Sequence, residues 1–124
     1  MKDQGRSTKK RTGGRRRRAR GKRLHELGRE STETQVGEGR FKTVDARGNT
    51  RKMRAITTDT ASVATDGEVV AAEIENVAEN PSNPNYARRN IITRGAILET
   101  NEGRVRVTSR PGQDGQVNGV LVED

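Results

Sequence analysis

The amino-acid sequence predicts an all-β protein: a small six-stranded, barrel-like body that carries a disordered or extended basic arm at its N-terminus. The first 30 residues contain only Leu24 and Leu27 as large aliphatic side chains after Met1, too few to form a core. From about residue 34 onward, short runs rich in Val and Ile alternate with turn sequences, which is typical of short strands. We therefore expect two parts, a basic arm at residues 1–30 and a β-barrel-like body at residues 31–124.

Six segments of the body are expected to be strands: residues 40–46, 52–63, 69–77, 96–100, 104–108 and 117–123. Alternation of polar and apolar residues at 72–75 and 104–107 indicates half-buried antiparallel strands. Turn sequences such as Arg47-Gly48-Asn49 separate the segments. A small barrel or sandwich is expected, because closing a sheet removes its exposed edges.

The charge is concentrated at one end of the chain. The whole chain has a net charge of +8, but residues 1–30 hold thirteen Lys and Arg and only three acids, so the remainder is slightly acidic. Such a basic segment predicts a polyanionic partner, nucleic acid before membrane. The sequence has no cysteine, and its longest strictly apolar run, residues 69–72, is far too short to span a membrane. We expect a cytoplasmic protein without a membrane partner.

The arm has the strongest signal for nucleic-acid binding. Glycines allow close approach of the backbone to phosphate, and the arginine guanidinium binds phosphate in bidentate geometry. A solvated charge run or a nuclear-localisation patch is the alternative, but residues 4–25 contain no acid, whereas a solvated face normally mixes charges. The predicted RNA-binding residues of the arm are Arg6, Lys9, Lys10, Arg11, Arg15, Arg16, Arg17, Arg18, Arg20, Lys22 and Arg23.

A second candidate site is the loop at residues 80–90. Two Asn-Pro pairs favour an extended backbone before each proline, and the only tyrosine and two arginines follow. A tyrosine can stack on an unpaired base while arginines bind the flanking phosphates, so Asn85, Tyr86, Arg88 and Arg89 are predicted to contact RNA. The alternative is a tyrosine that packs on the core beside solvated arginines.

A third candidate is the turn at residues 108–115, in which Arg110 precedes Pro111-Gly112. Composition alone favours a purely structural role for this turn.

The sequence predicts no catalytic residue, no cofactor, no metal site and no small-molecule substrate. His25 is the only histidine and lies in the basic arm, and Gly37-Glu38-Gly39 lacks the third glycine of a phosphate loop, because Lys42 stands there. Two rival functions stay open: a chromatin-type protein that binds any polyanion, and a nucleic-acid-processing enzyme that uses carboxylates of the body.

Two long blocks of the sequence resemble the archaeal and eukaryotic small-subunit ribosomal protein eight-e family, in its short archaeal form. The first runs from Ile74-Glu75-Asn76-Val77 into Asn80-Pro81-Ser82-Asn83-Pro84-Asn85-Tyr86-Ala87-Arg88-Arg89-Asn90-Ile91-Ile92-Thr93, and the second is Val107-Thr108-Ser109-Arg110-Pro111-Gly112-Gln113-Asp114-Gly115. The resemblance implies a barrel-like β body and an extended basic arm, bound to small-subunit ribosomal RNA beside neighbouring small-subunit ribosomal proteins. It also favours a role for Arg110 in RNA binding.

Overall fold

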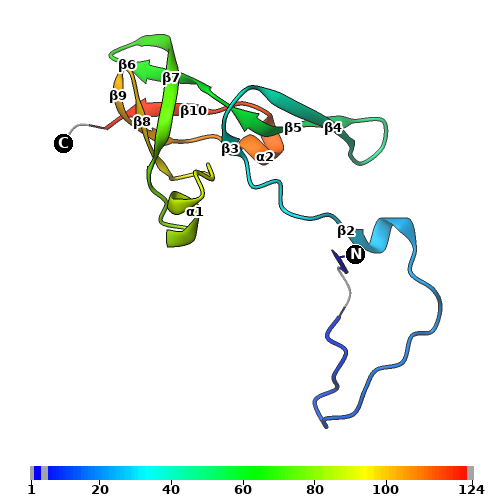
Figure 1. Cartoon of the computed structure of the whole chain (residues 1–124). Coiled ribbons are helices and arrows are strands. Elements are labelled where there is room, and N and C mark those ends of the chain that lie inside the picture. Colours follow the sequence, from blue (N-terminus) through cyan, green and yellow to red (C-terminus); the bar gives the residue numbers. More distant parts are fainter. Residues whose placement is uncertain (1, 4–5, 123–124) are drawn as a thin grey trace. The chain divides into compact units, whose positions relative to one another are not determined.

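Strands make up most of the regular structure of the chain, which a computed structural model describes at residues 2–3 and 6–122 (Figure 1). The chain divides into two units, Met1–Ser31 and Thr32–Asp124. The first unit holds β1 (Lys2–Asp3), the 3-10 helix η1 (Leu24–Glu26) and β2 (Leu27–Gly28). The second holds β3 (Gln35–Val36), β4 (Arg40–Asp45), β5 (Arg51–Thr58), β6 (Thr60–Thr65), β7 (Glu68–Glu79), α1 (Pro84–Arg88), β8 (Ile97–Thr100), β9 (Gly103–Val107), α2 (Pro111–Asp114) and β10 (Asn118–Leu121).

A closed barrel forms the centre of the second unit, with the strand order β10-β6-β7-β8-β9. Neighbouring strands are antiparallel except for β10 and β6, which pair in parallel and close the sheet. The all-β class and the barrel are therefore confirmed. The predicted number of six barrel strands is wrong, because the barrel of the described chain has five.

The miscount arises where the chain passes from one sheet to another. The predicted strand at residues 52–63 is two strands, β5 and β6, which are separated by Asp59. The carbonyl of Asp59 accepts a hydrogen bond from the Ile74 N–H of the barrel at 2.7 Å. The other predicted strand outside the barrel, residues 40–46, is β4, which pairs only with β5 in a separate three-stranded sheet of order β3-β5-β4.

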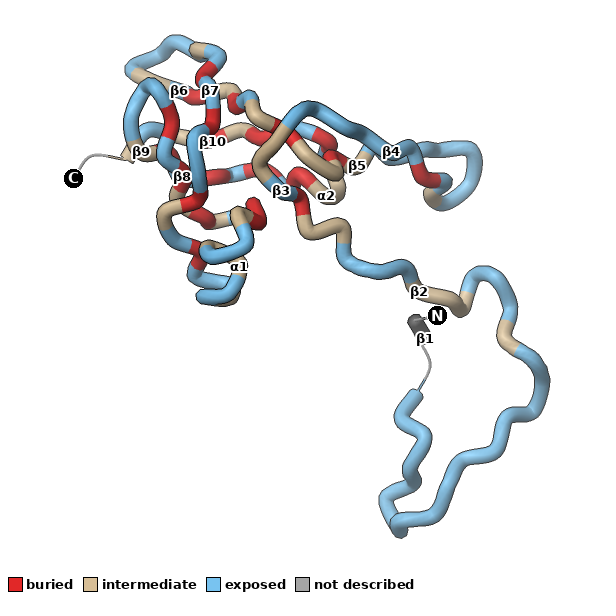
Figure 2. Tube along the Cα trace, viewed as in Figure 1, coloured by how far each residue is buried: buried red, intermediate tan, exposed pale blue. Residues whose placement is uncertain are grey.

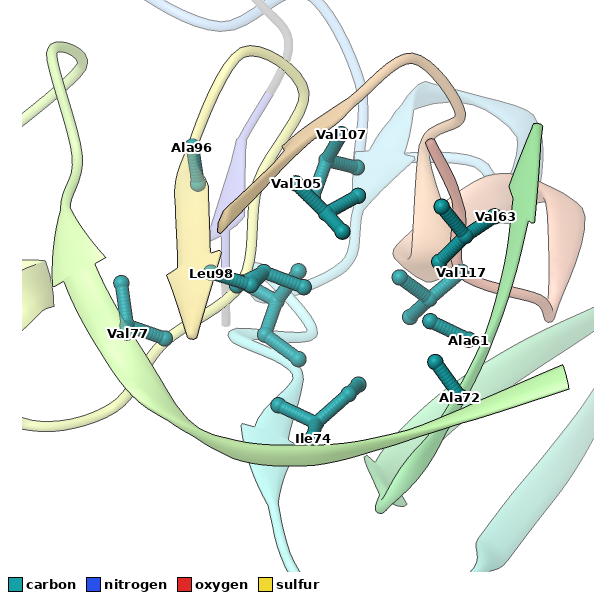
Figure 3. Close-up of a cluster of buried hydrophobic side chains, with 11 residues drawn as sticks. Ala61, Val63, Ala72, Ile74, Val77, Ala96, Leu98, Val105, Val107 and Val117 are labelled. Atoms are coloured by element: carbon teal, nitrogen blue, oxygen red, sulfur yellow. The ribbon is translucent and has the colours of Figure 1, made fainter. Parts of the chain in front are cut away.

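The barrel interior is filled by small and medium-sized aliphatic side chains (Figure 3). On β9, Val105 and Val107 are buried while Arg106 is exposed, which is the predicted alternation. On β7, Ala72 and Ile74 point inward, and Figure 2 shows the same alternation of buried and exposed positions around the barrel. The full cluster of buried residues is Ala61, Val63, Ala72, Ile74, Val77, Ile92, Ala96, Leu98, Val105, Val107 and Val117.

The three-stranded sheet is joined to the rest of this unit through β5. The hydroxyl of buried Thr34 donates to the Ala55 carbonyl at 2.6 Å, and α2 packs against the same strand. Beyond this point β4 and the first half of β5 extend as a hairpin, whose turn is closed by a hydrogen bond from the Thr50 N–H to the Arg47 carbonyl at 3.3 Å. Gly48 in this turn has φ +64°, a conformation that glycine adopts readily.

Candidate nucleic-acid interface

The arm places its cationic side chains at the surface. Every described residue from 6 to 31 is exposed or half-buried. Eight exposed cations make no ion pair with any acid in the part of the chain that the structure describes. These are Arg6, Lys9, Lys10, Arg11, Arg15, Arg16, Arg17 and Arg18.

A short turn interrupts the extended path of the arm. The Lys10 N–H donates to the Gly14 carbonyl at 2.6 Å, and the Arg16 N–H donates to the Thr8 carbonyl at 2.8 Å. Gly13 lies in this turn with φ +91°, so the backbone reverses at a glycine. The reversal sets Lys9 opposite Arg15, so two like charges are paired across the turn in the free protein.

The C-terminal end of the arm contains an internal ion pair. Arg20 Nη2 lies 2.5 Å from Glu26 Oε1, and His25 Nε2 lies 3.6 Å from the same oxygen. The hydrogen bond from Arg20, with a smaller contribution from the Arg23 N–H, lowers the pKa of the Glu26 carboxyl despite some desolvation. Arg20 is therefore held by η1 in the free protein, unlike the eight cations that precede it.

The second candidate site folds into a one-turn helix rather than the predicted loop. Asn83 is extended (φ −162°, ψ 122°), as its position before proline predicts, and its side chain accepts from the Asn85 N–H at 2.9 Å as the N-cap of α1. Pro84 occupies the first turn, where no backbone donor is needed. The Asn-Pro pair that indicates a loop is also a helix start, and this ambiguity explains the difference.

Buried Asn80 holds the chain on both sides of α1. Its Nδ2 donates to the Ile91 carbonyl at 3.1 Å, while its Oδ1 accepts from the Ser82 N–H and the Thr93 hydroxyl, each at 3.0 Å. Asn80 thus positions the helix without facing solvent. The sequence does not predict this role for Asn80, whose only signal is the Asn-Pro dipeptide.

The four predicted side chains of this site lie together on α1 and at its C-cap. Asn85, Arg88 and Arg89 are exposed, and Tyr86 is half-buried. Arg89 Nη2 lies 3.3 Å from Glu33 Oε2, so this guanidinium already has a carboxylate partner in the free protein. Arg88 is the more available cation.

The third candidate site is also a one-turn helix. Arg110 is the N-cap of α2, and its N–H donates to Asp114 Oδ2 at 3.0 Å while its exposed side chain takes no part in capping. Buried Ser109 braces the turn: its hydroxyl donates to the Gln116 carbonyl at 2.8 Å and accepts from the Asn118 N–H at 2.9 Å. The backbone of Arg110 is structural, whereas its guanidinium is available to a ligand.

The two helical sites stand on different elements of the second unit. α1 packs against β7 and α2 against β5, and Figure 1 shows them apart from each other. The structure therefore brings Asn85, Tyr86, Arg88 and Arg89 together but does not add Arg110 to that cluster.

Two further findings concern the described residues only. No helix among them has the length and apolar character required to cross a membrane. Within the same residues, no group of three or more His, Cys, Asp or Glu side chains is arranged to hold a metal ion.

Known proteins match the chain along nearly its whole length, across both the arm and the barrel. The family model for ribosomal protein S8e matches residues 3–122. The chain is 72% identical over 123 residues to small ribosomal subunit protein eS8 of Haloarcula marismortui, covering 99% of this chain and 100% of that protein. It is 63% identical to eS8 of Halorubrum lacusprofundi, again with 99% and 100% coverage, and 48% identical to eS8 of Methanobrevibacter smithii, with 96% and 97% coverage.

These matches identify the class of protein: the chain is a ribosomal protein and not an enzyme. It belongs to the ribosomal protein S8e family, which confirms the predicted family resemblance.

Proposed function

We propose that this chain is a structural constituent of the small ribosomal subunit in the cytoplasm, where it binds and stabilises small-subunit ribosomal RNA and aids subunit assembly. The names of its relatives support the small subunit as its location. Its partners are then small-subunit ribosomal RNA and neighbouring small-subunit ribosomal proteins.

The observation that carries the proposal is the set of eight exposed arm cations. None of them forms an ion pair with an acid among the residues that the structure describes. Close-packed like charges repel one another in the free protein, and RNA phosphates remove this repulsion and release counterions. Residues 1–30 therefore act as the RNA-binding arm, threading between RNA segments, and residues 31–124 act as the body.

The sites at α1 and α2 orient the body on the RNA, whereas most of the positive charge is in the arm. Tyr86 and Arg88 on α1, and Arg110 at α2, project from short helices that Asn80 and Ser109 brace by buried hydrogen bonds. A braced backbone loses little conformational entropy on binding, so these sites can select one RNA geometry. In this proposal the arm provides most of the affinity, while the two helical sites set the register of the body on the folded RNA.

Binding experiments with altered arms test this division of roles. The probe is small-subunit ribosomal RNA of Haloarcula marismortui, the source of the relative at 72% identity. We expect deletion of residues 1–30 to remove most of the affinity. Replacing Arg15, Arg16, Arg17 and Arg18 by Gln is expected to flatten the plot of log affinity against log salt by about 0.7–0.9 for each phosphate that is no longer bound.

Circular dichroism of the body serves as the control for folding. A truncated protein that keeps its strand signal and still binds ribosomal RNA as tightly as the intact chain would exclude the threading arm.

A further inference from the structure

The hairpin formed by β4 and the first half of β5, residues 40–54, carries a charge opposite to that of the rest of its unit. Counted with the two residues before it, as residues 38–54, this segment holds six Lys and Arg and two acids. The other residues of 32–124 hold six Lys and Arg against twelve acids. Half of the unit's cations are thus gathered in one projecting element (Figure 1).

Strand pairing places three of these six cations, Lys42, Lys52 and Arg54, on one face of the hairpin. Lys42 pairs directly with Arg54, and the next pair on the same face sets Lys52 opposite Val44. Like charges at directly paired positions repel each other, and Lys42 lies directly opposite Arg54. A polyanion against this face would reverse that effect.

Two exposed cations of the hairpin are available to such a partner. The side chains of Lys42 and Arg47 are exposed and make no ion pair or hydrogen bond within residues 6–122, whereas Lys52 donates to Gln113 Oε1 at 3.0 Å. Arg47 lies in the turn that Gly48 permits, at the end of the hairpin. Lys42 and Arg47 therefore offer two phosphate-binding positions along one hairpin.

The opposite face exposes apolar surface. Phe41 pairs with Ala55, and Thr43 pairs with Met53, so Phe41 and Met53 are diagonal neighbours on this face. Phe41, the only phenylalanine of the chain, is 53% exposed, and Met53 is 52% exposed. A large aromatic side chain left half in water offers a flat surface on which an unpaired base can stack.

We propose that the hairpin is a further RNA-binding element of this protein, in which Lys42 and Arg47 bind phosphates and Phe41 stacks on an unpaired base. The cations alone would complement either RNA or an acidic protein. The exposed ring of Phe41 favours RNA, because RNA has unpaired bases that can stack on it and a protein has none. The proposal rests on the proposed function, because it takes ribosomal RNA as the ligand. It adds a contact that neither the arm nor the two helical sites provide.

Full-length variants with matched controls test the hairpin. The cationic face is tested with the double variant Lys42→Gln and Arg47→Gln. Its charge-matched control is Arg94→Gln with Arg106→Gln, two exposed arginines outside the hairpin and outside the proposed helical sites. The aromatic face is tested with Phe41→Ala and with Phe41→Tyr, which keeps the ring.

The measurements are affinity for Haloarcula marismortui small-subunit ribosomal RNA across a salt series, and hydroxyl-radical footprints of each complex. We expect the hairpin double variant to flatten the salt dependence by about 1.4–1.8, at 0.7–0.9 for each phosphate contact, while the control leaves it unchanged. Phe41→Ala is expected to bind about 5- to 150-fold more weakly, and Phe41→Tyr as wild type. The affected footprint should be one group of nucleotides distinct from those that arm deletion exposes.

The possible failures can be told apart. If wild type prefers ribosomal RNA but both hairpin variants match it in salt dependence and footprint, the hairpin inference is wrong and the proposed function stands. A third measurement is incorporation of each variant into small subunits reconstituted from ribosomal RNA and proteins. If the same variants bind RNA as wild type but are incorporated poorly, the hairpin contacts a protein, which also overturns the inference. If wild type shows no preference for ribosomal RNA, the proposed function itself fails. Matching circular dichroism and thermal midpoints exclude unfolding as a cause.

Discussion

The side-chain amide of Asn80 donates to the Ile91 carbonyl at 3.1 Å across the segment that contains α1. This bond joins the end of β7 to the buried residues that follow the helix, and the carbonyl oxygen of the same amide accepts from Ser82 and Thr93. One buried side chain therefore sets the position of Tyr86 and Arg88 on the barrel.

Replacing Asn80 by Ala is expected to lower the free energy of unfolding by about 1–3 kcal/mol, because it leaves the buried Ile91 carbonyl without its partner. Urea unfolding followed by circular dichroism measures the change. Asn76→Ala is the control, since Asn76 is exposed on β7. Equal stability of the two variants would show that Asn80 does not brace the helix.

Gly119 on β10 is a position where only glycine fits. A Cβ there would lie 2.4 Å from Val105 Cγ1 and 2.7 Å from the Arg106 carbonyl oxygen. We expect Gly119→Ala to lower the free energy of unfolding by about 1–3 kcal/mol through overpacking of the barrel. Gly37→Ala is the matched control, because its nearest neighbour, Thr57 Cβ, is 3.8 Å away. A thermal midpoint for Gly119→Ala equal to that of Gly37→Ala would contradict the close packing of β10 against β9.

Titration of Glu26 tests the structure of the arm in free protein. Its pKa is lowered from 4.5, first by the hydrogen bond from Arg20. Because the folded pKa lies below the unfolded one, this pair stabilises the turn above about pH 4.5 and loses its effect as the pH falls through the lowered pKa. Carboxyl NMR titration is expected to show a higher Glu26 pKa in Arg20→Gln than in wild type. The same Glu26 pKa in both proteins would show that η1 and Arg20 are not in contact in solution.

Arg88 and Arg110 are predicted to contribute to RNA binding without supporting the fold. Each substitution by Ala is expected to cost about 1–3 kcal/mol in affinity for small-subunit ribosomal RNA, by analogy with specific nucleic-acid contacts. The fold should persist in Arg110→Ala, because α2 uses the backbone of Arg110 and not its guanidinium. Arg106→Ala, on the exposed side of β9, is the control. Affinities equal to that of the control would remove these two residues from the interface.

Strand character and the basic arm could be predicted from local sequence because both are local properties. The alternation at residues 104–107 and the density of arginine before residue 24 are visible without any partner. The passage between two sheets at Asp59 was not predictable in this way, because residues 52–63 form a continuous strand-like pattern and only tertiary pairing divides it.

The candidate sites also include features that local sequence does not determine. Asn83 acts as a helix cap only because α1 follows it, and local sequence also allows a loop. The positive charge of residues 40–54 can be counted in the sequence, but its arrangement cannot. Lys42 and Arg54 are twelve positions apart, and they become one cationic face only when β4 pairs with β5.

The most direct test of the central claim compares two RNAs with the intact chain. Affinity is measured across a salt series for Haloarcula marismortui small-subunit ribosomal RNA and for a large-subunit ribosomal RNA fragment of equal length. Salt screens the phosphate contacts that any RNA offers, so we expect the preference for the small-subunit RNA to persist at high salt. If both affinities fall together along one steep slope, the chain is a general polyanion binder, which would contradict a specific place in the small subunit.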